Sequence, residues 1–586
     1  MTATTGRHNR AFRCPLVTAD APAAPTCLAA IATLLVSACS TSPGARPEAA
    51  AGSWAVDVPA INRPEGETAA WWFRAGAAQA AERGAMAGNA RNVILFVGDG
   101  MSLTTVAAAR ILAGQRAGQP GEEHRLSWEH FPATALSRTY NTDLQTPDSA
   151  GTMTAMATGA KARAGVISVG QAPRRGDCAG GRDHALLSLW ELAAASGLRT
   201  GVVTTARLTH ATPAATFAHS PDRNWERDTE TPATAREAGC RDIASQLVDP
   251  ALGRGADVLM GGGRHNFLPA TQPDPEYPRQ TGKRNDGRDL VAEWQRAHPT
   301  GTYAWNATQL SAAPMDAPLL ALFEPDHMRF EHDRADDAGG EPSLADMTRA
   351  AIERLQAQST QGYVLLVEAG RIDHAHHYGN AHRALVDTVA LSDAVQAAVE
   401  LTNTDDTLVM VTADHSHTLT FAGYPARGNP ILDKVRGFAD EDAPAGEYAL
   451  DATGRPYTTL GYANGPGNTG ASGSQPVGPK RFLHPGKGFK PATGRPDLTD
   501  VDTRDPDYMQ EALVPLASES HGGDDVGVWA RGPGSAAVRG SIEQNALFHL
   551  MVQATPRLRE ALCKRDLCNA QGVPVELPDP ADFKAR

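Results

Sequence analysis

Six short apolar runs recur along the 586-residue chain, separated by stretches with helical character. They read NVILFVGDG, TGVVTTA, ADVLMGGG, GYVLLVEAG, TLVMVTADHSH and DVGVWARGPG. Continuous runs of this kind, rich in β-branched residues or Leu, are typical of strands buried on both faces of a parallel sheet. With helices between them, they predict an α/β protein: a three-layer sandwich with a mainly parallel central sheet flanked by helices.

The segment 422–514 interrupts this rhythm. It is dense in Gly, Pro, Asn and Asp, as in NGPGNTGASGSQPVGP, and shows little helical periodicity. Two interpretations are open: an inserted subdomain on the rim of the sheet, or a loop that is partly disordered. The strand-like run YTTLGYA favours the subdomain. We therefore expect an α/β domain of residues 66–421 and 515–586 with an inserted rim region at 422–514.

The N-terminus has the pattern of an export signal. Three arginines precede the apolar run CLAAIATLLV, which is too short to span a bilayer and ends in small residues before Cys39. VSAC resembles the bacterial lipobox, in which the cysteine becomes the lipidated N-terminus. We expect a lipoprotein signal peptide at 1–38, lipidation of Cys39 and a flexible tether at 39–65. The protein would be exported and lipid-anchored to the bacterial cell envelope; the alternative is a buried core helix.

The cysteines agree with export. Two of the seven lie in the expected signal peptide and Cys39 would carry lipid. Four cysteines remain, and an even number in an oxidising compartment predicts two disulfides. Spacing alone allows three pairings of Cys178, Cys240, Cys563 and Cys568, and a bond within the close C-terminal pair is the simplest.

The formal charge of −13 limits the class of partner. It disfavours nucleic acid or an anionic membrane surface, so membrane contact is expected only through the lipid anchor. A small anionic substrate is allowed, provided that cations gather locally.

Acidic and imidazole side chains lie next to the predicted strands. Ligands of open parallel sheets bind beyond the carboxyl ends of the strands. The residues at these positions are Asp99, Glu368, Asp373, His377, Asp414, His415 and His521. They are ligand types expected for zinc and magnesium rather than for a thiolate metal. Singly, an Asp after a strand is usually a helix cap, but the set favours a metal centre.

Two spacings within the set are informative. Asp373 and His377 stand at i and i+4, so on a helix they share one face and could bind one ion. Asp414 and His415 are adjacent, so on a straight strand they would point to opposite faces. They could converge only if the chain bends away at the strand end.

A small-residue stretch, TPDSAGTMTAMATGAKA, contains the candidate nucleophile. Pro147 and Asp148 predict a turn, which places Ser149 at or near a helix N-terminus, where anions are favoured. A hydroxyl coordinated to a metal there would be an effective nucleophile. The alternative is that Ser149 only caps the helix.

Six motifs occur in order between about Trp71 and Cys568: VGDGM, TPDSAGTMTA, THATPAATFAHSPDRNW, VEAGRIDHAHH, VTADHSH and SESHGGDDVGVWARGP. They closely resemble the alkaline phosphatases, particularly the animal-type branch. The resemblance implies an enzyme that hydrolyses small phosphate monoesters through a phosphoserine, with two zinc ions and one magnesium ion per subunit.

The resemblance also implies residue roles. Ser149 would be the nucleophile, and Arg223 would bind two phosphate oxygens, which suits a guanidinium group. The first zinc ion would be held by Asp373, His377 and His521. The second would be held by Asp99, Asp414 and His415. Magnesium would be held by Asp99, His210, Thr212 and Glu368.

Further family features map onto this chain. The disulfides would be Cys178–Cys240 and Cys563–Cys568. The rim region would correspond to the crown-like part of the family, and TAAWWFRAG resembles its N-terminal helix that embraces a partner subunit, which implies a homodimer. A calcium site is suggested by Glu276, the Phe323 carbonyl, Glu324 and Glu341. At the fourth position the chain departs from the family run DPSL: it reads EPSL after a two-residue shift, which leaves calcium binding open.

Two other functions are weighed against this one. A phosphodiesterase or sulfatase of the same superfamily is disfavoured by Arg223 and the THATP motif, and no C-x-P-x-R run supplies a sulfatase nucleophile. A non-catalytic metal-binding surface lipoprotein would need neither Ser149 nor Arg223.

Overall fold

The computed structural model describes residues 54–250, 252, 255–437 and 446–584. The expected signal peptide, Cys39 and the first part of the tether lie outside these residues. Among the described residues, no helix combines the length and apolar character needed to span a bilayer.

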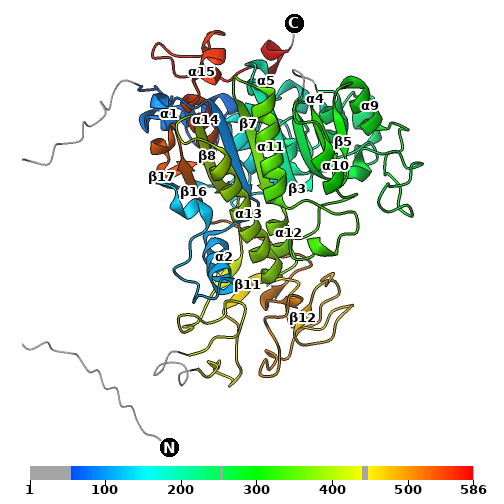
Figure 1. The fold of residues 1–586 in the computed structure, drawn as a ribbon. Helices are drawn as coiled ribbons and strands as arrows, with labels where there is room; N and C mark the ends of the chain where they lie inside the picture. Colours follow the sequence, from blue (N-terminus) through cyan, green and yellow to red (C-terminus); the bar gives the residue numbers. More distant parts are fainter. Residues whose placement is uncertain (1–53, 251, 253–254, 438–445, 585–586) are drawn as a thin grey trace, which may run out of the picture. The chain divides into compact units, whose positions relative to one another are not determined.

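A ten-stranded sheet forms the centre of the described chain (Figure 1). Its strands, in spatial order, are β17 (Arg539–Glu543), β2 (Ala133–Arg138), β16 (Val526–Arg531), β8 (Thr407–Ala413), β1 (Asn92–Gly98), β7 (Tyr363–Ala369), β3 (Arg199–Arg207), β4 (Val258–Gly262), β6 (Leu319–Leu322) and β5 (Thr302–Ala304). The six predicted apolar runs correspond to β1, β3, β4, β7, β8 and β16, which confirms the α/β fold with a mainly parallel sheet.

One of the predicted strands runs against its neighbours. β16 is antiparallel to both β8 and β2, whereas the other pairings in this sheet are parallel. An apolar run carries no information on strand direction, so this reversal is not predictable from the run itself. Its consequence is that the start of β16 lies at the edge where β1, β7 and β8 end.

Helices cover both faces of the sheet (Figure 1). On one face are α1 (Ala69–Glu82), α3 (Ser149–Thr158), α5 (Leu189–Ala195) and α14 (Ala546–Ala554); on the other are α2 (Leu103–Arg116), α11 (Leu344–Gln358) and α13 (Ala381–Leu401). Alternate residues of β1 belong to the two cores: Val93 and Leu95 to the first, Ile94 and Phe96 to the second. This explains why the run is continuously apolar.

Shorter helices lie in the connections. They are α4 (Cys178–Asp183), α6 (Ala211–Ala214), α7 (Ala233–Glu237), α8 (Ile243–Val248), α9 (Leu290–Ala297), α10 (Ala307–Ala312), α12 (Arg371–His377) and α15 (Pro556–Cys563). Of these, α6 follows β3 and α12 follows β7, so both begin at the carboxyl edge of the sheet.

Helix α1 packs against α14 of its own chain. Trp72 and Phe73 are buried, and the Asn545 side chain donates a hydrogen bond to the Trp72 carbonyl (2.8 Å). A Cβ added at Gly76 would lie 2.6 Å from Cδ2 of His549, so the two helices approach closely where the sequence has glycine.

Small sheets lie in the rim region and beside it. β10 (Leu419–Phe421), β11 (Leu460–Gly465) and β14 (Ala512–Pro515) form one, and β12 (Lys480–Arg481) pairs with β13 (Tyr508–Met509). The strand-like run YTTLGYA leads into β11. The remaining short pair is β9 (Ser416–His417) with β15 (His521–Gly522).

Both disulfides expected from the family resemblance are present. Cys178 bonds to Cys240 and Cys563 bonds to Cys568, with Cα atoms 5.9 Å and 4.9 Å apart. The structure therefore confirms one of the three pairings that spacing alone allows.

Candidate metal centre and active site

The acidic residues at the ends of β1, β7 and β8 lie close together, because the last residues of these strands pair with one another. The side chains of Asp99, Glu368 and Asp414 are fully buried. His521 precedes the antiparallel strand β16, so it joins the same edge from the opposite chain direction.

Ser149 is the first residue of α3. Asp148 caps this helix by accepting a hydrogen bond from the N–H of Gly151 (3.1 Å). A Cβ added at Gly151 would lie 2.4 Å from Nδ2 of Asn141, which explains the need for a small residue there. The Ser149 hydroxyl lies 3.1 Å from Nε2 of His415. The expected helix N-terminus is confirmed, and the capping residue is Asp148 rather than the serine.

Asp99, Asp414 and His415 form one compact group. Nε2 of His415 lies 3.4 Å from Oδ1 of Asp99 and 3.3 Å from Oδ2 of Asp414. Nδ1 of His415 lies 3.2 Å from the Ser416 carbonyl. A proton on Nδ1 would be donated to that carbonyl, which leaves the Nε2 lone pair directed at the carboxylates, as in metal-binding histidines. β8 ends at Ala413, so the chain bends away as the spacing requires.

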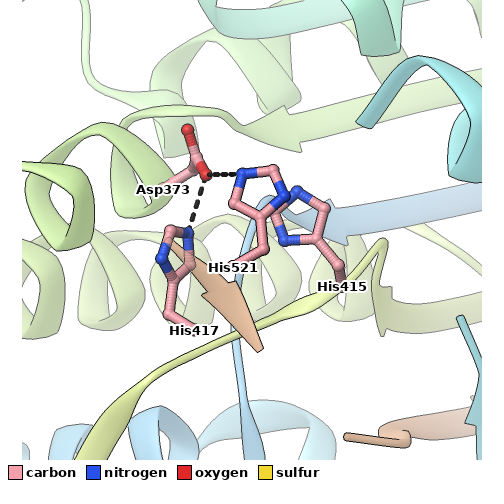
Figure 2. A group of neighbouring side chains, drawn as sticks. All are labelled: Asp373, His415, His417 and His521. Atoms are coloured by element: carbon pink, nitrogen blue, oxygen red, sulfur yellow. Dashed lines mark hydrogen bonds and ion pairs between the residues drawn. The ribbon is translucent and has the colours of Figure 1, made fainter. Parts of the chain in front are cut away.

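Asp373, His377 and His521 form a second group. Oδ1 of Asp373 lies 3.3 Å from Nε2 of both histidines, and Figure 2 shows its approach to His521. The two Nε2 atoms are 3.2 Å apart, while each Nδ1 is bonded to a backbone carbonyl, of Glu519 (2.5 Å) and Pro147 (2.7 Å). With protons on Nδ1, two lone pairs face each other beside a carboxylate. A cation between them would relieve this repulsion.

The expected magnesium set contains buried atoms without a hydrogen-bond partner. They are both carboxylate oxygens of Asp99, Nδ1 of His210, Oγ1 of Thr212 and Oε1 of Glu368. The other oxygen of Glu368 accepts a hydrogen bond from Thr204. Ligand atoms of Asp99, His210 and Glu368 lie within 4.8 Å of one another. Buried polar atoms nearly always have partners, so this set fits a hard divalent cation.

Arg223 is fixed next to the serine. Its Nη1 donates to Oδ2 of Asp148 (3.0 Å), and its Nη2 lies 3.2 Å from Nε2 of His210. Burial would lower the pKa of Arg223, but Asp148, together with Asp99 and Asp373, raises it, so the group remains charged. The guanidinium group is thus placed to bind an anion at Ser149.

The electrostatics of the centre favour a bound cation. Burial raises the pKa of Asp99 well above its usual range, and Asp414, Asp373 and Glu368 add to the rise. Burial likewise raises the pKa of Glu368 to about 7. Burial lowers the pKa of His415 well below its usual range, which keeps the imidazole neutral. Mutually repelling carboxylates and neutral imidazoles are the donor set that divalent cations bind.

Two further residues contact the centre, although the family resemblance assigned them no role. Nε2 of His417 lies 2.7 Å from Oδ1 of Asp373 (Figure 2), and its Nδ1 is bonded to the Glu519 carboxylate. Burial would lower the pKa of His417, but Glu519 and Asp373 raise it to about 10. The sequence signals are the alternation of His415 and His417 in VTADHSH and the position of Glu519 two residues before His521 in SESHGGDDVGVWARGP.

A group of three histidines borders the centre. Ligand atoms of His210, His327 and His374 lie within 4.8 Å of one another. The backbone N–H of Arg207 donates to Nδ1 of His327 (3.1 Å), and Arg371 donates to Nδ1 of His374 (3.0 Å). The sequence motifs did not indicate His327 as a neighbour of the site.

The residues of the expected calcium site lie in loops near β4 and β6. Burial, and then the Glu276 carboxylate, raise the pKa of Glu324 to about 7. Burial, and then Glu324, raise the pKa of Glu341 to about 8. The three glutamates therefore share one electrostatic cluster, and Phe323 precedes Glu324 directly.

Comparisons with known proteins agree with the geometry. The family model described as "Alkaline phosphatase" matches residues 90–556. The tissue-nonspecific alkaline phosphatase isozyme of Gallus gallus is 42% identical over 475 residues, which cover 79% of this chain and 84% of that protein. The same isozyme of Homo sapiens is 41% identical over 473 residues, covering 79% and 83%.

Among solved structures, the alkaline phosphatase of Thermus thermophilus matches the fold with a TM-score of 0.56 and 24% identity. The match covers 85% of this chain and 96% of that one.

Proposed function

The chain belongs to the alkaline phosphatase family, and from this membership and the geometry of its centre we propose that it hydrolyses small phosphate monoesters through a phosphoserine intermediate. The observation that carries the proposal is the 3.1 Å distance between the Ser149 hydroxyl and Nε2 of His415, within a cluster of metal-type ligands. A non-catalytic metal-binding protein would have no need of this contact.

We propose two zinc ions and one magnesium ion per subunit. The first zinc ion is assigned to Asp373, His377 and His521, and the second to Asp99, Asp414 and His415. Magnesium is assigned to Asp99, His210, Thr212 and Glu368. The unpartnered buried atoms of the magnesium set and the facing Nε2 atoms of His377 and His521 support these assignments. When bound, the ions would lower the pKa of the serine hydroxyl and of water and compensate the charge of the phosphoryl group.

Arg223 binds and orients the substrate in this proposal. Its guanidinium group holds two oxygens of the phosphoryl group, while Asp148 fixes its direction. The leaving group makes no contact that recognition requires, so we expect broad specificity for monoesters.

Ser149 then attacks the phosphorus atom. A bond forms between Oγ and phosphorus while the ester P–O bond breaks, and the leaving oxygen gains a proton to become an alcohol. The N-terminus of α3 favours negative charge on Oγ during this step. Phosphoryl transfer needs mainly position and charge compensation, which a buried, rigid helix provides.

The second step regenerates the enzyme. The oxygen of a water molecule bonds to phosphorus from the side opposite Ser149, the Oγ–P bond breaks, and the serine regains a proton as inorganic phosphate leaves. Arg223 holds the phosphoryl group in both steps.

We further propose that the protein is exported, lipid-anchored through Cys39 and homodimeric. The two disulfides support an oxidising compartment. Intact-mass analysis of the membrane fraction tests the anchor, since Cys39 without acyl groups would contradict it, and light scattering tests the dimer.

The function is tested by comparing three substrates at alkaline pH: p-nitrophenyl phosphate, bis-p-nitrophenyl phosphate and p-nitrophenyl sulfate. We expect the monoester to be hydrolysed fastest, with activity lost on chelation and restored by zinc with magnesium. Faster turnover of the diester or the sulfate would identify a different member of the superfamily. Activity that survives complete metal removal would contradict the metal centre.

A further inference from the structure

A second cluster of carboxylates lies in the loops near β4 and β6. Besides Glu276, Glu324 and Glu341 it contains Asp337, which the family resemblance does not assign. The Tyr277 hydroxyl joins two of the members, since it lies 3.1 Å from Oε1 of Glu324 and 3.4 Å from Oδ1 of Asp337.

Two oxygens of this cluster are buried without a hydrogen-bond partner: Oε1 of Glu276 and Oδ2 of Asp337. The side chains are only 4% and 1% exposed. The Asp337 carboxylate is among the charged groups that act on Glu276, so the two acidic groups lie close to each other. A buried carboxylate oxygen with no donor is costly, and two together indicate a place for a cation.

The arginines nearby do not balance the charge. Arg264 is bonded to both oxygens of Asp274 and to Oε2 of Glu276. Nε of Arg329 lies 3.4 Å from Oε1 of Glu324 and 3.4 Å from Oδ1 of Asp337, and the Arg329 side chain is 34% exposed. The guanidinium groups of Arg264 and Arg329 thus face the five carboxylates of Asp274, Glu276, Glu324, Asp337 and Glu341, whereas Arg334, near Glu341, is paired with Glu331.

The loop that carries Asp337 closes tightly over Glu276. A Cβ added at Gly339 would lie 2.2 Å from Oε1 of Glu276, and Gly340 has a φ of +81°. This loop lies just before Glu341, where the run EPSL is shifted by two residues from the family pattern. The two glycines let this loop approach the carboxylate of Glu276, and Asp337 lies in the same loop.

Glu341, which stands at the position of the fourth calcium ligand implied by the family resemblance, already accepts hydrogen bonds. Its two carboxylate oxygens accept from the backbone N–H of Arg329 at 3.2 Å and 3.1 Å. Its carboxylate therefore supports the chain at Arg329, whereas Oδ2 of Asp337 is free to bind.

We propose that Asp337 is a ligand of a divalent cation of the calcium type, bound together with Glu276 and Glu324, and that Glu341 supports the loop instead. An all-oxygen carboxylate set of this kind suits calcium rather than zinc. The inference rests on the calcium site that the family resemblance suggests, and it is independent of the phosphoserine mechanism.

The test measures binding of radioactive calcium by equilibrium dialysis, with zinc and magnesium held constant so that the catalytic centre stays loaded. We expect one calcium ion per wild-type chain, and Asp337→Asn to weaken binding at least tenfold. Glu341→Gln should weaken it less than Asp337→Asn does. The matched control is Asp336→Asn, an exposed neighbour, whose affinity should equal that of wild type.

A thermal readout separates binding from misfolding. Without calcium, Asp337→Asn should melt at the same or a higher temperature than wild type, because it removes one negative charge from a cluster in which carboxylates outnumber guanidinium groups. With calcium, only wild type and Asp336→Asn should show the full rise. Asp337→Asn that binds calcium like wild type would overturn the proposal.

Arg329 provides the competing explanation, in which its guanidinium group is the resident cation. A wild-type protein that binds no calcium, together with an Arg329→Gln variant that does, would establish that alternative and refute ours. Monoester hydrolysis by the wild-type protein is measured in parallel. A wild-type protein that binds calcium as expected but does not hydrolyse the monoester would count against the proposed function and leave this inference standing.

Discussion

The hydroxyl of Ser149 lies 3.1 Å from Nε2 of His415, at the N-terminus of a fully buried helix. Replacing Ser149 with Ala should lower kcat for p-nitrophenyl phosphate by at least about a hundredfold, because the phosphoenzyme can no longer form. Acid quenching with a ³²P-labelled monoester should trap label on the wild-type chain only. Ser137→Ala, which removes another buried hydroxyl, is the control and should keep full activity. Labelling of the Ser149 variant would rule out this nucleophile.

Arg223 is held by Asp148, the residue before the nucleophile. Arg223→Ala should weaken inhibition by inorganic phosphate by about tenfold to a hundredfold, the worth of one or two charge-assisted hydrogen bonds, while part of the activity remains. Arg223→Lys should recover only part of the affinity, because an ammonium group lacks the planar fork. Arg175→Ala, a more exposed arginine paired with Asp222, serves as the control. Unchanged phosphate affinity in Arg223→Ala would refute the proposed role of Arg223 in binding phosphate.

His417 links Asp373 to Glu519 and so fixes the direction of a proposed zinc ligand. His417→Ala should reduce zinc affinity by about tenfold to a hundredfold, the usual effect of losing a residue that orients a metal ligand. The measurement is competition with a zinc-binding dye. His130→Ala removes an exposed histidine and should have no effect. If His417→Ala retains zinc as wild type does, the contact is structural only.

The sequence allows the central strands to be predicted but not the direction of each. β1, β7 and β8 are buried on both faces, so their apolar runs are unbroken. β2 alternates buried and exposed residues over much of its length, and this weaker pattern did not mark it as a strand. The antiparallel direction of β16 leaves no trace in composition. This direction nevertheless explains why His521 precedes its strand, whereas Asp99 and Asp414 follow theirs.

The candidate site likewise has contacts that the sequence predicts and contacts that it does not. The i, i+4 spacing of Asp373 and His377 survives folding because both lie on one short helix. The contact between His417 and Glu519 joins residues about a hundred positions apart, through the pairing of β9 with β15. Asp337 enters its cluster through a glycine-dependent loop. Contacts of these two kinds depend on tertiary structure, which local spacing does not encode.

His549 connects α1 and α14 and should make the protein sensitive to acid. Burial lowers its pKa from 6.5 to about 3, and its ring packs on Phe73 with Nε2 3.2 Å from the Gly159 carbonyl. The unfolded chain therefore binds a proton at a pH where the folded chain does not. The stability linked to this group is complete above about pH 6.5 and is lost progressively as the pH falls toward 3. By pH 5 the loss is about 2 kcal/mol.

Two histidine replacements with opposite expected effects on the pH dependence of stability test this linkage. His549→Gln keeps a donor for Gly159 and should lose less unfolding free energy between pH 7.5 and pH 5 than wild type does. For His219, burial would lower the pKa, but Glu191 and the Ser168 carbonyl together raise it. The stability contributed by His219 is therefore present at low pH and is lost as the pH rises. His219→Gln should therefore increase the acid loss. Metal release at low pH affects all three proteins, so the differences between their pH slopes isolate the histidines. Equal slopes for the two variants would show that neither histidine controls the acid response.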